Sequence, residues 1–221
     1  MEMIILGITL IITLGAQAYI NSAYNQTRRI KAVKGLSGAD VARKILNANG
    51  LKSVKVEEQP GTLTDHYDPR SKVVRLSTDI YNNTSLASVS VASHECGHAI
   101  QDKDGYFFLR LRSSIVPLVN IASTLGYVAI MIGLVMGAIG FIRIGIIMEL
   151  VILAFQLITL PVEFNASSRA LKQITELGIV SADEHKYCRK MLTAAALTYV
   201  AAVATAALQV LRLVLIARDR N

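Results

Sequence analysis

The sequence predicts an α+β membrane protein that is mostly helical, with three or four transmembrane helices and a small polar part containing a short antiparallel sheet. Two observations support this class. The 221 residues are 52% hydrophobic, which exceeds the usual content of a soluble domain of this length, and the apolar residues are concentrated in long blocks. Between these blocks lie short β-branched runs bounded by Pro, Gly and Asp, which are typical of small sheets.

Four apolar blocks have roughly the length needed to cross the hydrocarbon core of a bilayer, about 20 helical residues. They are residues 3–20, 115–139, 144–160 and 192–217. Thr198, Thr205, Gln209 and Arg212 interrupt the last block, so it is either a fourth transmembrane helix or a membrane-associated helix. The first block follows Met1-Glu2-Met3 rather than a basic segment and precedes no small-residue cleavage pattern, so we expect a retained anchor.

The distribution of basic residues predicts the orientation in the membrane. The formal net charge is +7, and Lys and Arg cluster directly after the first block and directly before the second. Juxtamembrane Lys and Arg mark the cytoplasmic side. We therefore expect residues 21–114 and 161–190 to be cytoplasmic. The basic residues are not interleaved with aromatic residues, so no nucleic-acid partner is expected.

The polar segment after the first block predicts one helix and then a sheet. Ser37 with Asp40 three residues later is a helix start, and Asn49-Gly50 is a stop. The β-branched runs at 52–58 and 71–77 are separated by Pro and Gly turn residues, which indicates two or three antiparallel strands.

Two further helices are predicted to carry the chemistry. The first begins at Thr84 or Ser85 and ends near Asp104-Gly105. After the second and third blocks, joined by a turn at 140–143, the other helix opens at Pro161 and ends at Gly178.

The pattern His94-Glu95-Cys96-Gly97-His98 lies inside the first of these helices. Residues four apart share one helix face, so both imidazoles can reach the same ion. Imidazole nitrogen is a preferred zinc ligand, and Glu95 is placed to take a proton from a water at the metal. Without a metal, the same residues would be an ordinary helix surface. The scarcity of histidine in this chain favours the metal site.

A catalytic zinc site needs a third protein ligand. His66 and His185 are candidates, but Glu163 is the better one, because it is an acid at the boundary between an apolar block and a polar helix. A carboxylate at a helix N-terminus also has a simpler explanation in the helix dipole. Two imidazoles and one carboxylate suit a single zinc ion.

Three segments resemble the YugP-like family of bacterial membrane zinc metallopeptidases. They are HECGH, "LTDHYDPRSKVVRLS" before it and "LPVEFNASSRAL" after it, and the similarity extends over most of the chain. The resemblance implies a neutral zinc peptidase with a few membrane helices and a small cytoplasmic, zincin-like catalytic domain. It implies no particular substrate.

The arrangement is also similar, more distantly, to gluzincin membrane peptidases, in which a later helix supplies a glutamate ligand and an acid four residues further on supports a histidine. Glu163 matches that ligand, whereas position 167 is serine. A hydroxyl orients imidazole less strongly than a carboxylate. Ser167 or Asn165 is expected to take this role, and His66 or Arg169 is a candidate to stabilise the oxyanion.

Three other features have expected structural roles. Cys96 points away from the metal face of its helix and is expected in the core, as a reduced thiol. Gly97 is expected where a neighbouring segment approaches closely. The strand KVVRLS is either an ordinary buried strand or an open edge to which an extended peptide adds.

Together these observations predict one integral membrane peptidase domain over residues 1–221, multi-pass in a bacterial plasma membrane, which cleaves a peptide or protein substrate with one Zn²⁺ and Glu95 as general base. An intramembrane-cleaving protease is disfavoured, because polar residues flank the motif on both sides. A membrane scaffold or adaptor with a structural metal is the alternative from another class.

Overall fold

The computed structural model describes residues 1–219; Arg220 and Asn221, the end of the predicted 1–221 domain, lie outside this part of the chain. The chain forms two compact units. The apolar unit comprises Met1–Gln17, Arg110–Pro161 and the segment from Leu197 onward, and the site unit comprises Ala18–Leu109 and Val162–Ala196. Within the described residues, four helices contribute residues to both units.

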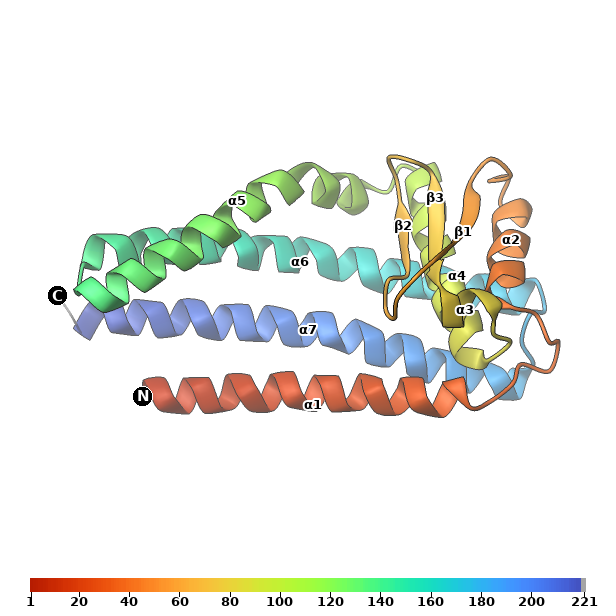
Figure 1. Ribbon diagram of the computed structural model, residues 1–221, viewed down its shortest axis with the longest axis horizontal. Coiled ribbons are helices and arrows are strands. Elements are labelled where there is room, and N and C mark those ends of the chain that lie inside the picture. Colours follow the sequence, from red (N-terminus) through yellow and green to blue (C-terminus); the bar gives the residue numbers. More distant parts are fainter. Residues whose placement is uncertain (220–221) are drawn as a thin grey trace. The chain divides into compact units, whose positions relative to one another are not determined.

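Within the described residues, four helices are long and apolar enough to cross a membrane. They are α1 (Glu2–Arg28), α5 (Phe107–Met136), α6 (Ile139–Glu176) and α7 (Ala182–Asp219) (Figure 1). Their apolar side chains are widely exposed, as at Ile11 (72%) and Val135 (80%). Such exposure is unfavourable in water and favourable in a bilayer. The fourth apolar block thus belongs to a helix of spanning length.

Small residues bring α5 and α6 together in the apolar unit. A Cβ added at Gly126 would lie 2.8 Å from Met148, and one at Gly133 would lie 2.6 Å from Ile142. Because lipid gives no hydrophobic drive for helix association, close backbone approach of this kind is a common basis of packing in membranes.

Two predicted helix boundaries are wrong. The turn between α5 and α6 lies at residues 137–138, where Gly137 has a positive φ of 67°, so residues 140–143 are helical. Pro161 lies inside α6 and does not open a new helix. A helix can continue through proline when the freed carbonyl one turn earlier finds another partner, which sequence alone does not reveal.

The site unit contains three strands, β1 (Lys55–Gln59), β2 (His66–Asp68) and β3 (Val73–Ser77), in the order β1-β3-β2 (Figure 1). β2 pairs antiparallel with β3, whereas β1 pairs parallel with it. The expectation of a wholly antiparallel sheet is therefore wrong for β1. The hairpin between β2 and β3 turns at Asp68, whose carboxylate accepts hydrogen bonds from Arg70 N and Ser71 Oγ.

This strand order also decides the two interpretations of KVVRLS. β3 is the central strand, paired on both sides, and four of its five residues are buried. It is an ordinary buried strand, and the idea that it offers an open edge to a peptide is wrong.

Three helices complete the fold around this sheet: α2 (Gly38–Ala48), the short α3 (Thr78–Asn82) and α4 (Leu86–Lys103). Ser37 and Asp40 form the predicted capping box, and Ser85 caps α4. α3 was not predicted from sequence. The core lies between α2, α4 and β3, and its fully buried side chains include Ile45, Leu76 and Leu86.

Candidate metal centre

α4 places the two histidines of HECGH on one face. His94 and His98 are four residues apart, and their ring centroids lie 4.8 Å from each other. Their side chains remain 15% and 11% exposed, while Glu95 is buried with 7% of its surface exposed. Cys96 is fully buried and packs toward the carbonyl of Ala42, as expected for a core thiol.

The third side chain comes from α6. Glu163 is 2% exposed, and its Oε2 lies 3.2 Å from His94 Nε2 and 3.7 Å from His98 Nε2. α6 reaches this position because α4 carries a glycine at the contact: a Cβ at Gly97 would collide with the carbonyl oxygen of Ala166. The close approach predicted for Gly97 is confirmed.

The donor set of this cluster fits zinc. One ligand atom from each of His94, His98 and Glu163 lies within 4.8 Å of the other two. Ligands about 2.1 Å from a tetrahedral zinc ion lie roughly 3.4 Å from one another, close to the distances between the Nε2 and carboxylate atoms. Two neutral imidazoles and a carboxylate are also the donor types that zinc prefers.

Hydrogen bonds fix the orientation of the His98 ring. Its Nδ1 lies 3.0 Å from Gln101 Oε1, and Gln101 is fully buried. The amide orientation of Gln101 is determined, because its Nε2 donates to Val162 O (2.8 Å) and to Asn165 Oδ1 (3.0 Å). The oxygen must therefore face His98 and accept a hydrogen bond from Nδ1–H, which leaves the Nε2 lone pair directed at Glu163.

The His94 ring is held in a similar way by Ser167. Ser167 Oγ lies 3.2 Å from His94 Nδ1 and can accept a hydrogen bond from Nδ1–H. The side chain that replaces the expected acid thus contacts the ring it was predicted to support. Both histidines present Nε2 to the same point, and their contacts at Nδ1 are compatible with the tautomers that a metal site requires.

Burial and charge act on the two glutamates in opposite directions. Burial raises the pKa of Glu95 to about 7; the neighbouring charge of His94 opposes this shift, and that of Glu163 adds to it. Burial would also raise the pKa of Glu163, but without a metal, when the imidazole rings carry a proton at Nε2, their hydrogen bonds and charge outweigh burial and hold this pKa well below its ordinary value. Glu163 is therefore a carboxylate anion at neutral pH.

The other predicted site residues lie farther from the histidine rings. Asn165 Oδ1 accepts from Arg169 Nε at 2.7 Å as well as from Gln101, and Arg169 Nη1 donates to Asp104 Oδ2 at 2.5 Å. The chain of bonds from Asp104 thus ends at His98. His66, in β2, contacts the carbonyl of Thr64 at 2.7 Å and the guanidinium of Arg75 at 3.4 Å. Neither His66 nor His185 belongs to the metal-ligand cluster found among residues 1–219.

Sequence reasoning missed Gln101. A glutamine three residues after His98 lies on the same side of α4, and this spacing is a signal that could have suggested the contact. Its burial, which requires hydrogen-bond partners on α6, was visible only in three dimensions.

Comparison with known proteins agrees with the class of protein that this site defines. The chain belongs to the family described as "Putative neutral zinc metallopeptidase", whose model matches residues 2–218. It is also 46% identical over 209 residues to the "Putative membrane protease YugP" of Bacillus subtilis (strain 168), which covers 93% of each chain. No solved structure matches. The resemblance noted in the sequence is confirmed, and the chain is a membrane protein of this family.

Gly97→Ala tests the contact between α4 and α6. The added methyl group would meet the backbone of Ala166, and we expect a loss of about 1–3 kcal/mol in unfolding free energy together with weaker zinc binding. Thermal unfolding and zinc content in detergent measure the two effects. Gly15→Ala, where a Cβ meets nothing within 4 Å, is the matched control and is expected to be neutral. Unchanged stability and zinc content in Gly97→Ala would contradict the contact.

Gln101→Leu tests the orientation of His98. The leucine keeps the volume but removes the acceptor at Nδ1, so we expect zinc affinity to fall about 10–100-fold. Competition with a chromophoric chelator measures the affinity. Gln173→Leu removes an amide that bonds Asn49 and touches neither histidine, so its zinc affinity is expected to match the wild type. Equal affinities in both variants would show that Gln101 does not orient the ring.

Proposed function

We propose that this chain is a membrane-embedded zinc endopeptidase whose single Zn²⁺ is held by His94, His98 and Glu163. The observation that supports this most directly is the convergence of both Nε2 atoms and a buried carboxylate, with each Nδ1 already satisfied by Gln101 or Ser167. A structural zinc site usually has four protein ligands, whereas a catalytic one has three and an open position. Three candidate ligands fit the second class.

When bound, zinc lowers the pKa of a coordinated water and polarises a peptide carbonyl. The chain's own residues would do the remaining work. Glu95 lies next to His94 on α4 but outside the three-ligand cluster, so it is free to act as general base. Its carboxylate takes a proton from the attacking water and passes it to the leaving amine, as the HExxH spacing predicts.

Residues beyond the ligands would hold this geometry. Ser167 and Gln101 fix the two imidazole rings, and Asn165 and Arg169 extend the support of Gln101 to Asp104. We propose that these residues position the imidazole rings rather than stabilise the oxyanion, because their hydrogen-bonding groups already contact protein atoms. His66, which contacts Thr64 and Arg75, is not assigned a catalytic role.

The proposed location is a bacterial plasma membrane, with residues 21–114 and 161–190 on the cytoplasmic side and apolar segments 3–20, 115–139, 144–160 and 192–217 in the bilayer. The clustering of Lys and Arg supports this orientation. The domain is expected to act on a peptide or protein substrate at the membrane surface.

Glu95→Gln tests the enzyme directly. We expect purified wild type in detergent to cleave an unstructured protein such as casein, and Glu95→Gln to lose at least about 10³-fold in rate with equal bound zinc, because the amide cannot accept the proton. Zinc is quantified by elemental analysis. Cleavage that persists in the variant would remove Glu95 as base. Zinc in both proteins without cleavage in either would favour a scaffold with a structural metal.

A cysteine in place of Lys52 tests the orientation. Both natural cysteines are buried, so they give little background, and Lys52 is exposed. We expect Lys52→Cys to react with an impermeant maleimide only after cells are permeabilised. Gly140→Cys, at an exposed position between segments 115–139 and 144–160 where an added Cβ meets nothing within 4 Å, is the control for the opposite side and is expected to react in intact cells. The reverse pattern would invert the topology.

A further inference from the structure

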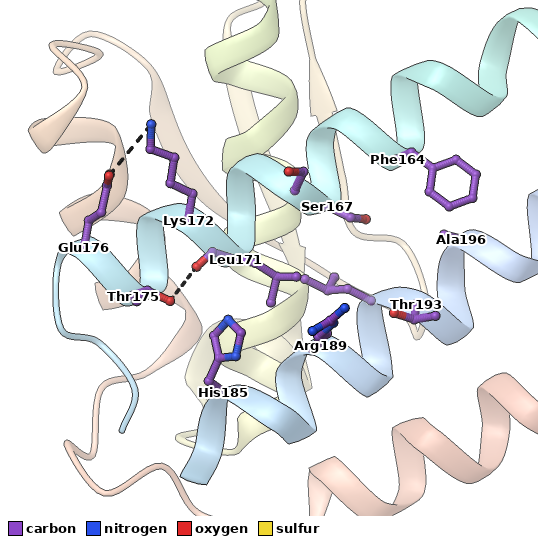
Figure 2. A pocket seen from close by; sticks show the side chains of 12 residues that line it. Phe164, Ser167, Leu171, Lys172, Thr175, Glu176, His185, Arg189, Thr193 and Ala196 are labelled. Carbon is purple, nitrogen blue, oxygen red and sulfur yellow. Dashed lines mark hydrogen bonds and ion pairs between the residues drawn. The ribbon is translucent and has the colours of Figure 1, made fainter. Parts of the chain in front are cut away.

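The site unit contains a groove of about 590 Å³ between the C-terminal part of α6 and the N-terminal part of α7 (Figure 2). All of its lining residues belong to this unit. It adjoins the metal centre through Ser167, which is part of the lining and whose Oγ contacts His94 Nδ1. The groove contains none of the three candidate ligands.

The charges of the groove are unbalanced. His185 and Arg189 lie one turn apart on α7 and line the groove, and within the described part of the chain neither side chain has an acidic partner (Figure 2). On the α6 side, Lys172 and Glu176 form an exposed ion pair at 3.8 Å and neutralise each other. One permanent positive charge and one imidazole therefore remain available to an occupant.

The other walls are apolar or carry hydroxyl groups. Phe164, which is 47% exposed, contributes to the lining with Leu171, Leu192 and Ala196. An aromatic ring exposed beside a guanidinium without an acidic partner is suited to a ligand that has both acidic and apolar groups. A small inorganic anion would use the guanidinium and leave the apolar walls uncovered.

The length of the groove is appropriate for a peptide. From Phe164 to Glu176 the lining extends over twelve helical steps of α6, about 18 Å. About five residues of extended chain cover that distance.

We propose that this groove binds an acidic, partly apolar segment of the polypeptide substrate, with its carboxylates on Arg189 and His185. This inference rests on the proposed peptidase function, since it names the substrate class of the same site. Arg189 is then a specificity-determining residue: its guanidinium forms a bidentate pair with a carboxylate, and the apolar side chains of the segment pack on Phe164 and Leu192.

The test measures binding separately from cleavage. Full-length Glu95→Gln in neutral detergent is titrated into a fluorescent ten-residue peptide that alternates Asp or Glu with Leu or Phe, and into a matched peptide with Asn and Gln in place of the acids. We expect the acidic peptide to bind at least tenfold more tightly and to lose this preference when Arg189→Gln is added. Arg189→Lys should recover part of it.

Lys190→Gln is the matched control, because Lys190 neighbours Arg189 but bonds Gln26 and lies outside the groove lining. With Lys190→Gln added, the affinity for the acidic peptide should equal that of the Glu95→Gln protein. Equal binding of both peptides, or an equal loss in Lys190→Gln and Arg189→Gln, would overturn the proposal. The proposal would also be overturned if Arg189→Gln lost affinity only for vesicles containing phosphatidylglycerol and kept its affinity for the acidic peptide. That result would assign the groove to a lipid headgroup.

Failure of the peptidase function gives a different result. If the wild type cleaves no casein but the acidic peptide still binds through Arg189, the groove is a peptide site without the chemistry. If the wild type cleaves casein and the binding of neither peptide depends on Arg189, the peptidase function is supported and the assigned substrate class is wrong.

Discussion

The contact between Gly97 and Ala166 is the constraint on which the candidate metal centre depends. α4 supplies two imidazoles and α6 supplies one carboxylate, and these groups converge only if the two backbones approach closely. A glycine costs up to about 1 kcal/mol in a helix interior relative to alanine. That cost is offset here by the geometry it permits, since any Cβ at this position would move Glu163 away from the histidines.

Buried polar groups impose a second requirement on the same region. Glu163, Gln101 and Ser167 are all buried, and each unsatisfied polar group would cost about 1–3 kcal/mol. The network satisfies them together: Gln101 joins His98 to Asn165 and to the α6 backbone, and Ser167 joins α6 to His94. The Gln101 bonds that remove this penalty also select the tautomer of His98, so stability and the orientation of this ligand have one physical origin.

The membrane supplies the environment for the remainder of the chain. Helices α1, α5, α6 and α7 expose apolar side chains that only lipid would cover favourably. α6 combines both functions in one continuous helix: its first half belongs to the apolar unit, and its second half, after Pro161, carries Glu163 and one wall of the groove. The proposed substrate groove and metal centre therefore share a helix that begins in the membrane.

The sequence by itself determined the local features of this protein. Hydropathy located the membrane helices, Ser37 and the pair Thr84-Ser85 located two helix starts, and the spacing of His94 and His98 placed them on one face. Each of these properties depends on residues close together in the chain. Tertiary structure decided three other features: the parallel pairing of β1, the continuation of α6 through Pro161, and the burial of Gln101 against α6. They depend on partners distant in the chain, and neither propensity nor periodicity carries that information.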